Sequence, residues 1–259
     1  EVDLGLDVPL LTWVYGFGPD NITAVGFDGT VIHWDGSVWT AQETPTTEDL
    51  WGVWGSAPDN LWAVGGRGVA EDQATLLHYD GTEWTLAVLP EIERARVYAF
   101  FKVFGTSADN VYVVGQRGVV LHWNGIEWQE LLVGASDDLV SIWGTGPDRL
   151  VAVGGRANGI VSTWNGSEWR TESLAPLPGL NGIWMKEPGV AYAVGIQGTL
   201  IEINLDDFSY QDSSILSVLD FHAVFSATGQ TLVAVGGNLL ASSDSFEGIA
   251  FQRDLSDEE

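Results

Sequence analysis

The sequence predicts an all-β protein, a six-bladed β-propeller with four antiparallel strands in each blade. The first observation is a Val-Gly dipeptide that recurs at a mean interval of about 42 residues, with its glycines at Gly26, Gly65, Gly115, Gly154, Gly195 and Gly236. The second is a set of Asp-Gly or Asn-Gly turn pairs that follow the dipeptide in four copies. The third is that the intervening runs are rich in β-forming residues and show no helical period. Four short strands per copy are typical of a propeller, whereas a parallel β-helix has shorter repeats without regular hairpin turns.

The first strand of each copy is marked by an aromatic residue placed eleven residues before the Val-Gly glycine. Four residues earlier stands an apolar residue. The aromatic residues are Tyr15, Trp54, Phe104, Trp143, Trp184 and Phe225, and the apolar ones are Leu11, Leu50, Phe100, Leu139, Leu180 and Phe221. Positions filled alike in every copy are packing positions, because each blade meets the same two neighbours. We therefore expect both sets in the core.

Turn residues separate the remaining strands. Segments such as Pro58-Asp59-Asn60 predict a turn between the first and second strands, since proline presets φ. The pairs Asp35-Gly36, Asp80-Gly81, Asn124-Gly125 and Asn165-Gly166 predict type I′ hairpins between the third and fourth strands. A tryptophan three residues after each of these glycines enters the fourth strand, at Trp39, Trp84, Trp128 and Trp169.

The six copies fill the chain and leave no room for a second domain. We expect one propeller domain over residues 1–259, with blades over roughly 10–48, 49–98, 99–137, 138–178, 179–219 and 220–253. The last strand of the sixth blade is predicted over residues 248–253. Residues 1–9 are then extra, and either add a strand to the sixth blade or lie across a face.

Two phrases in the repeats resemble a known class of propeller. The segments Val53–Gly65 (VWGSAPDNLWAVG) and Leu121–Trp128 (LHWNGIEW) are similar to the repeats of bacterial WD40/YVTN/BNR-like propellers of the broad sialidase-like superfamily. Ser242–Ser245 (SSDS) is similar to the start of an Asp-box hairpin, although the recurring Asp-Gly-x-x-Trp hairpin is one residue shorter than a standard Asp-box. The resemblance implies the architecture, and function must be argued from the site.

The charge of the chain excludes several kinds of partner. Ten basic and 36 acidic residues give a net charge of −26, which argues against nucleic acid and against an anionic membrane surface. The absence of cysteine excludes disulfides, thiolate metal sites and cysteine nucleophiles. No apolar run approaches the roughly 18 residues of a spanning helix, so no membrane insertion is expected. Only two lysines accompany eight arginines, which suits an exported protein, and we expect a secreted, periplasmic or cell-surface monomer.

A candidate ligand site lies where the copies depart from one another. The second residue after the Val-Gly glycine, in the turn between the second and third strands, is arginine in three consecutive copies: Arg67, Arg117 and Arg156. The other copies carry Asp28, Gln197 and Asn238 there. In a propeller these turns share one face with the connections between blades, and we call this face the mouth. Arginine offers a planar fork that suits carboxylate, sulfate or phosphate.

Further residues complete the predicted site at the mouth. Trp51 and Phe101 occupy a variable first-strand position that the sixth copy fills with His222 and the other copies with Thr12, Val140 and Asn181. Lys102 is the residue after Phe101. Together with the three arginines they predict a pocket for an anionic ring, such as an acidic sugar, over blades two to four. The alternative is that the arginines only pair with nearby acids, for which we name Glu71, Asp72, Glu91 and Glu93.

Metal and cofactor sites are not expected. His33, His78 and His122 fill one repeat position on the third strand, and equivalent positions in separate blades do not converge. They are therefore expected to be structural. The many acidic turn residues leave calcium as the one alternative.

Three functions are compatible with these features. The first is a non-enzymatic exported or surface propeller that binds a protein or a glycan at the mouth. The second is a glycan-active enzyme of the sialidase-like type, for which Tyr98 with Glu91 or Glu93 is the one remote candidate for a nucleophile and its partner. The third is a purely structural repeat module of a larger surface protein.

Overall fold

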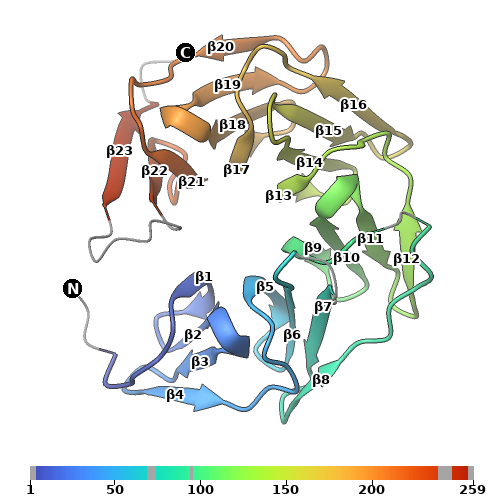
Figure 1. The fold of residues 1–259 in the computed structure, drawn as a ribbon, viewed down its shortest axis with the longest axis vertical. Helices are drawn as coiled ribbons and strands as arrows, with labels where there is room; N and C mark the ends of the chain where they lie inside the picture. The colour runs from blue at the N-terminus through green and yellow to red at the C-terminus, as the bar shows by residue number, and fades with distance from the viewer. Residues whose placement is uncertain (1–3, 69–73, 94–95, 239–246, 256–259) are drawn as a thin grey trace. The chain divides into compact units, whose positions relative to one another are not determined.

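The structure is a computed structural model that describes residues 4–68, 74–93, 96–238 and 247–255. The described residues form six antiparallel sheets, and the chain is an all-β, six-bladed β-propeller, which confirms the predicted fold class (Figure 1). Contacts between Cα atoms divide the chain into two compact units, Glu1–Leu132 and Val133–Glu259. Each unit holds three blades, and we describe each unit by itself.

The first unit contains three four-stranded sheets. Their strands are β1 (Leu11–Gly18), β2 (Asn21–Gly26), β3 (Val31–Trp34) and β4 (Trp39–Gln42); β5 (Leu50–Ala57), β6 (Asn60–Gly65), β7 (Thr75–Tyr79) and β8 (Trp84–Leu86); and β9 (Phe100–Ser107), β10 (Asn110–Gly115), β11 (Val120–Trp123) and β12 (Trp128–Leu131). Each strand pairs with the next one along the chain. The first strands of consecutive blades, β1, β5 and β9, pack against one another.

The second unit contains two four-stranded sheets and one three-stranded sheet. Their strands are β13 (Leu139–Gly146), β14 (Arg149–Gly154), β15 (Ile160–Trp164) and β16 (Trp169–Ser173); β17 (Leu180–Glu187), β18 (Val190–Gly195), β19 (Leu200–Asn204) and β20 (Tyr210–Asp212); and β21 (Asp220–Phe225), β22 (Thr231–Gly237) and β23 (Gly248–Asp254). Single 3-10 turns, η1 (Phe27–Gly29), η2 (Gln116–Gly118) and η3 (Ile196–Gly198), join the second and third strands of blades one, three and five.

The sixth blade departs from the expected four strands, since its described residues form three. The predicted last strand is present as β23, which pairs along its whole length with β22. In the other blades the partner of the second strand is the third strand, so β23 stands in the third position and not in the predicted outer one, and no fourth strand occurs among the described residues of this blade. The Asp-box-like residues Ser242–Ser245 lie outside the described residues. Residues 4–9 form no strand, and residues 1–3 are also not described.

The Val-Gly glycines recur because the backbone of the first strand approaches them closely. A Cβ built on Gly65 or Gly154 would overlap the carbonyl oxygen of Asp49 or Asp138, the residue just before the first strand. The other four glycines meet the corresponding carbonyls of Leu10, Ala99, Gly179 and Asp220. The repeat glycine is therefore required for close packing of two backbones.

The first-strand side chains are largely buried, as predicted. Leu50, Phe100, Leu139, Leu180 and Phe221 are fully buried, and Trp54, Phe104 and Trp184 nearly so. Leu11, Tyr15 and Trp143 are partly buried, and Phe225 has half of its surface exposed. Its ring meets those of Trp143 and Trp184 at 6.0 and 6.3 Å, and no further blade of the same unit follows to cover it.

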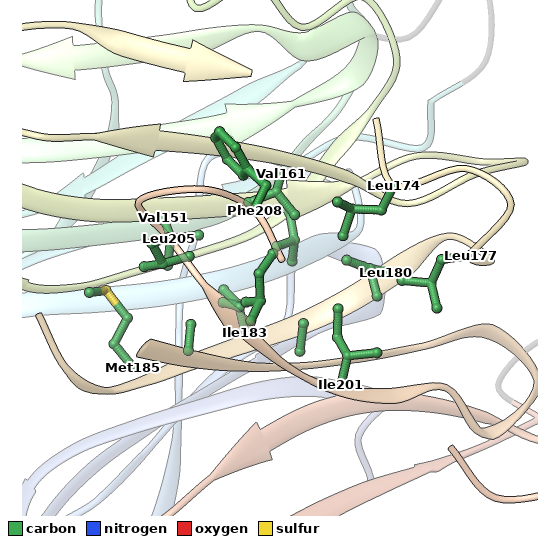
Figure 2. Packing of buried hydrophobic residues seen from close by; sticks show 14 residues of the cluster. Val151, Val161, Leu174, Leu177, Leu180, Ile183, Met185, Ile201, Leu205 and Phe208 are labelled. Carbon is green, nitrogen blue, oxygen red and sulfur yellow. The ribbon is translucent and has the colours of Figure 1, made fainter. Parts of the chain in front are cut away.

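The largest core cluster of the second unit lies between blades four and five. It contains fourteen residues, among them Val151, Val161, Leu180, Ile183 and Ile201 (Figure 2). Met185 and Leu205 lie beside Val151 at one end of the cluster, and Leu174 and Leu177 lie at the other (Figure 2). The end at Met185 and Leu205 also lines the cavity described below.

Hairpins join the third and fourth strands, as predicted, but the predicted type I′ geometry of their turns is wrong. A type I′ turn needs positive φ at both central residues, and here Gly36, Gly81, Gly125 and Gly166 have it while the residues before them do not. The polar residue instead caps the loop, because Asp80 Oδ1 accepts hydrogen bonds from the backbone N–H groups of Thr82 and Glu83 at 2.9 and 3.1 Å. The strands close over four residues, from Tyr79 to Trp84.

Valine in place of Gly81 or Gly125 is expected to lower the free energy of unfolding by about 1–3 kcal/mol. The φ values are 93° and 89°, and an added Cβ would stand 2.8 Å from the Cβ of Asp59 or Asp109. Urea unfolding followed by tryptophan fluorescence measures the change. If the free energy of unfolding decreases by less than about 0.5 kcal/mol in both variants, this account of the turns is wrong.

Candidate functional site

The turns at the mouth repeat one unusual backbone conformation in blades one, three and five. The φ and ψ angles are 56° and 36° at Asp28, 56° and 27° at Arg117, and 57° and 37° at Gln197. This is the left-handed region, which costs a non-glycine residue about 1 kcal/mol or more. All three side chains are exposed.

Carboxylates that precede or begin the first strands hold these turns. The backbone N–H of Asp28 donates to Asp49 Oδ1 at 3.1 Å, and that of Gln197 donates to Asp220 Oδ1 at 2.9 Å. In blade two, the N–H of Arg67 donates to Glu48 Oε2 at 3.2 Å. These contacts confirm that the turns and the connections between blades share one face.

Arg67 is held by residues of blade one and of its own blade. Its Nη2 lies 3.0 Å from both Asp28 Oδ1 and the carbonyl oxygen of Thr47, and its Nε lies 3.8 Å from Asp49 Oδ2. The ion pair therefore ties blade two to blade one. Glu71 and Asp72, which the ion-pair alternative named, lie outside the described residues.

The other two arginines of the predicted site are also placed at mouth turns. In the second unit, Arg156 Nε donates to Asp138 Oδ2 at 2.7 Å, and its backbone N–H donates to Asp137 Oδ2 at 3.0 Å. Arg117 extends from the exposed middle of η2 in the first unit. Arg67 and Arg156 thus have carboxylate partners, and binding of a ligand by the three arginines stays a prediction.

The aromatic and remaining residues of the predicted site are partly buried. Trp51 Nε1 donates to the carbonyl oxygen of Gly66 at 2.8 Å, and its ring meets Phe27 edge-on at 5.5 Å. Phe101 is half-buried on β9. In the second unit, His222 Nε2 hydrogen-bonds the carbonyl oxygen of Gly237 at 2.9 Å.

Lys102 differs from the expected exposed cation, because it is only 8% exposed. Its Nζ lies 2.9 Å from the ring centroid of Trp13 on β1. Burial lowers the pKa of Lys102 well below its usual value. The lysine is therefore part of the packing between first strands.

The third-strand histidines are structural, as predicted, in blades two and three. His78 Nε2 lies 2.7 Å from Asn60 Oδ1, and His122 Nε2 lies 2.7 Å from Asn110 Oδ1. Desolvation lowers the pKa of both rings, although Asp80 opposes the shift at His78. His33 Nδ1 contacts the Thr23 hydroxyl at 3.4 Å. No group of three or more His, Asp or Glu residues suited to a metal ion occurs among the described residues.

The residues named for the enzyme alternative are placed in a connection between blades two and three. The backbone N–H of Tyr98 donates to Gln116 Oε1 at 2.8 Å, and that of Glu93 donates to Glu130 Oε2 at 2.7 Å. These are contacts of the connecting backbone.

A cavity that sequence reasoning missed lies at the other end of the strands, between blades four and five. Its volume is about 300 Å³, and Arg149 and Arg170 line it together with Asp206. The signal was present in the sequence. Arg149 begins the second strand where three earlier copies have asparagine, at Asn21, Asn60 and Asn110.

Comparisons with known proteins identify structural neighbours. No family model matches the chain, and no curated protein matches it in sequence. It is similar to a solved structure of YCF48 bound to a D1 peptide, with 17% identity and a TM-score of 0.65 over 88% of this chain and 74% of that one. It is also similar to YCF48 from Cyanidioschyzon merolae, with 16% identity and a TM-score of 0.65 over 89% of this chain and 82% of that one. Within the described residues, no helix has the length and apolar character needed to cross a membrane.

Proposed function

We propose that this chain is a non-enzymatic binding propeller whose mouth recognises an exposed segment of a partner protein. The observation that carries the proposal is the constant backbone of the mouth turns. Asp28, Arg117 and Gln197 share one left-handed conformation, yet the exposed side chains are acidic, basic and neutral. Packing does not explain this variety, because exposed side chains make little contribution to the core.

Rigid turns with varied side chains suit recognition. Carboxylates fix the turn backbones, so little conformational entropy remains to be lost when a partner binds. The likeness to YCF48 bound to a D1 peptide supports a protein segment as the ligand. The repeat phrases support membership of the broad WD40/YVTN/BNR-like class, and the composition supports a location outside the cytoplasm, which fractionation of the source cells would test.

The experiment is selection of a random peptide library on the immobilised protein, followed by calorimetry with the enriched peptides. Replacing Asp28, Arg117 and Gln197 together by alanine is expected to weaken binding at least about tenfold. The matched control is Ile126→Ala, an exposed residue in a turn between third and fourth strands, which is expected to leave binding unchanged. Failure to enrich any peptide, or equal binding by the triple variant, would refute the proposal.

Arg67 and Arg117 of the first unit support a second ligand class for the mouth, an anionic group such as an acidic sugar. Trp51 and Phe101 support this second ligand class, because their first-strand position is filled by Thr12, Val140 or Asn181 in other blades. Arg117→Ala and Trp51→Ala are each expected to weaken binding of sialic or uronic acids at least about tenfold in calorimetry. If the parent protein does not bind these acids, or if both variants bind them as tightly as the parent, the arginines serve only as ion-pair partners.

A further inference from the structure

The cavity between blades four and five combines an apolar floor with a basic rim. Leu150, Met185 and Leu205 form the floor, and all three are buried. The rim carries Arg149 and Arg170. A volume of about 300 Å³ is at the lower end of the range of small-molecule sites.

The same place in blades two and three is filled by a histidine. His78 on β7 bonds Asn60 on β6, and Thr85 stands opposite it on β8. In blade three the corresponding residues are Asn110, His122 and Gln129, with the same hydrogen bond between asparagine and histidine.

Blade four replaces all three residues. The asparagine position holds Arg149, the histidine position holds Thr163, and the residue opposite is Arg170. Threonine lacks the imidazole ring, which leaves space at this place. Two cations therefore accompany the loss of a bulky side chain, a combination that the packing of the blade does not require.

The guanidinium groups keep donors available for a ligand. The ion pair of Arg149 among the described residues is a long one, with 3.9 Å between Nη1 and Asp206 Oδ1. Arg170 Nη1 donates to the backbone carbonyl oxygen of Asp206 at 3.0 Å, and its guanidinium lies 5.0 Å from the ring centroid of Phe208. Asp206 is thus the one acidic residue among those that line the cavity, beside two arginines, in a protein whose net charge is −26.

We propose that this cavity binds a small organic carboxylate with an apolar body. The carboxylate would bind the forks of Arg149 and Arg170, and the apolar body would lie on Leu150, Met185 and Leu205. The site lies at the strand ends opposite the mouth turns, so the inference is independent of the proposed function.

The test is titration of the full chain with benzoate, followed by isothermal calorimetry and by ¹H–¹⁵N NMR shifts. Benzoate is expected to bind saturably, with benzamide and inorganic phosphate at least about tenfold weaker. Arg149→Gln and Arg170→Gln are each expected to weaken benzoate binding at least about tenfold. Arg96→Gln is the matched control, since Arg96 is an exposed arginine of the first unit that does not line the cavity, and it is expected to change binding less than about twofold.

Thr163→His provides a second variant that restores the residue of blades two and three. It is expected to abolish benzoate binding while thermal melting shows the variant folded. Three results would overturn the inference: no saturable binding of benzoate, unchanged affinity in both glutamine variants, or phosphate binding as tight as benzoate. Loss of binding in Arg96→Gln equal to that in Arg149→Gln would also overturn it, because the effect would then be one of overall charge.

Discussion

Alanine in place of Gly154 is expected to unfold the second unit, with a loss of at least about 4 kcal/mol in the free energy of unfolding. The added Cβ would overlap the carbonyl oxygen of Asp138, and it would also lie 2.8 Å from the Cα of Leu139. Leu139 is fully buried and pairs with Gly154 across β13 and β14. Neither backbone can move away without breaking that pairing, so the clash cannot be relieved by a side-chain rotation.

Gly146→Ala is the matched control in the same sheet. An added Cβ on Gly146 meets no atom within 4 Å, and alanine there is expected to change stability by less than about 1 kcal/mol. Urea unfolding and the yield of folded protein compare the two variants. If the free energy of unfolding of Gly154→Ala is within about 1 kcal/mol of that of the parent, the close approach of the two backbones does not explain the Val-Gly repeat.

The fold was predictable because its requirements repeat in the sequence. Each blade needs a glycine where the backbone of its own first strand approaches, and residues such as Gly65 and Gly154 therefore recur with the blade period. Turn type was less predictable, since Asp80-Gly81 suits both a type I′ turn and a capped four-residue loop. The choice depends on where the side-chain oxygen of Asp80 finds backbone donors, and the dipeptide alone does not show this.

The candidate sites were predictable only in part. Repeat comparison located the mouth turns, but the partner of Arg67 is Asp28, a residue of the preceding blade that no local pattern connects to it. The cavity at Arg149 was not predictable, because its two arginines stand on separate strands of blade four, β14 and β16. Its two arginines become neighbours only through the register that places Arg170 opposite Thr163.

Replacement of Lys102 is also expected to change the free energy of unfolding strongly, because its amino group is buried among the packed first strands of the first unit. The equivalent residues in the two preceding blades are Trp13 and Gly52, and the missing side chain of Gly52 leaves room for Lys102 to reach the Trp13 ring. The described residues offer Lys102 no carboxylate or hydrogen-bond partner for its ammonium group. A ring face offsets only part of the cost of removing a charge from water.

Lys102→Met is therefore expected to raise the free energy of unfolding at pH 7 by about 1 kcal/mol or more. The pKa of Lys102 is lower in the folded protein than its usual 10.5, so between the two values the unfolded chain binds a proton that the folded protein does not. The free energy of unfolding is therefore highest above pH 10.5, and it decreases as the pH falls toward the pKa of Lys102 in the folded protein. Urea unfolding between pH 7 and 9.5 should show the parent gaining stability with pH while Lys102→Met gains less. Equal slopes, or a less stable variant at pH 7, would show that the ring of Trp13 compensates the buried charge in full.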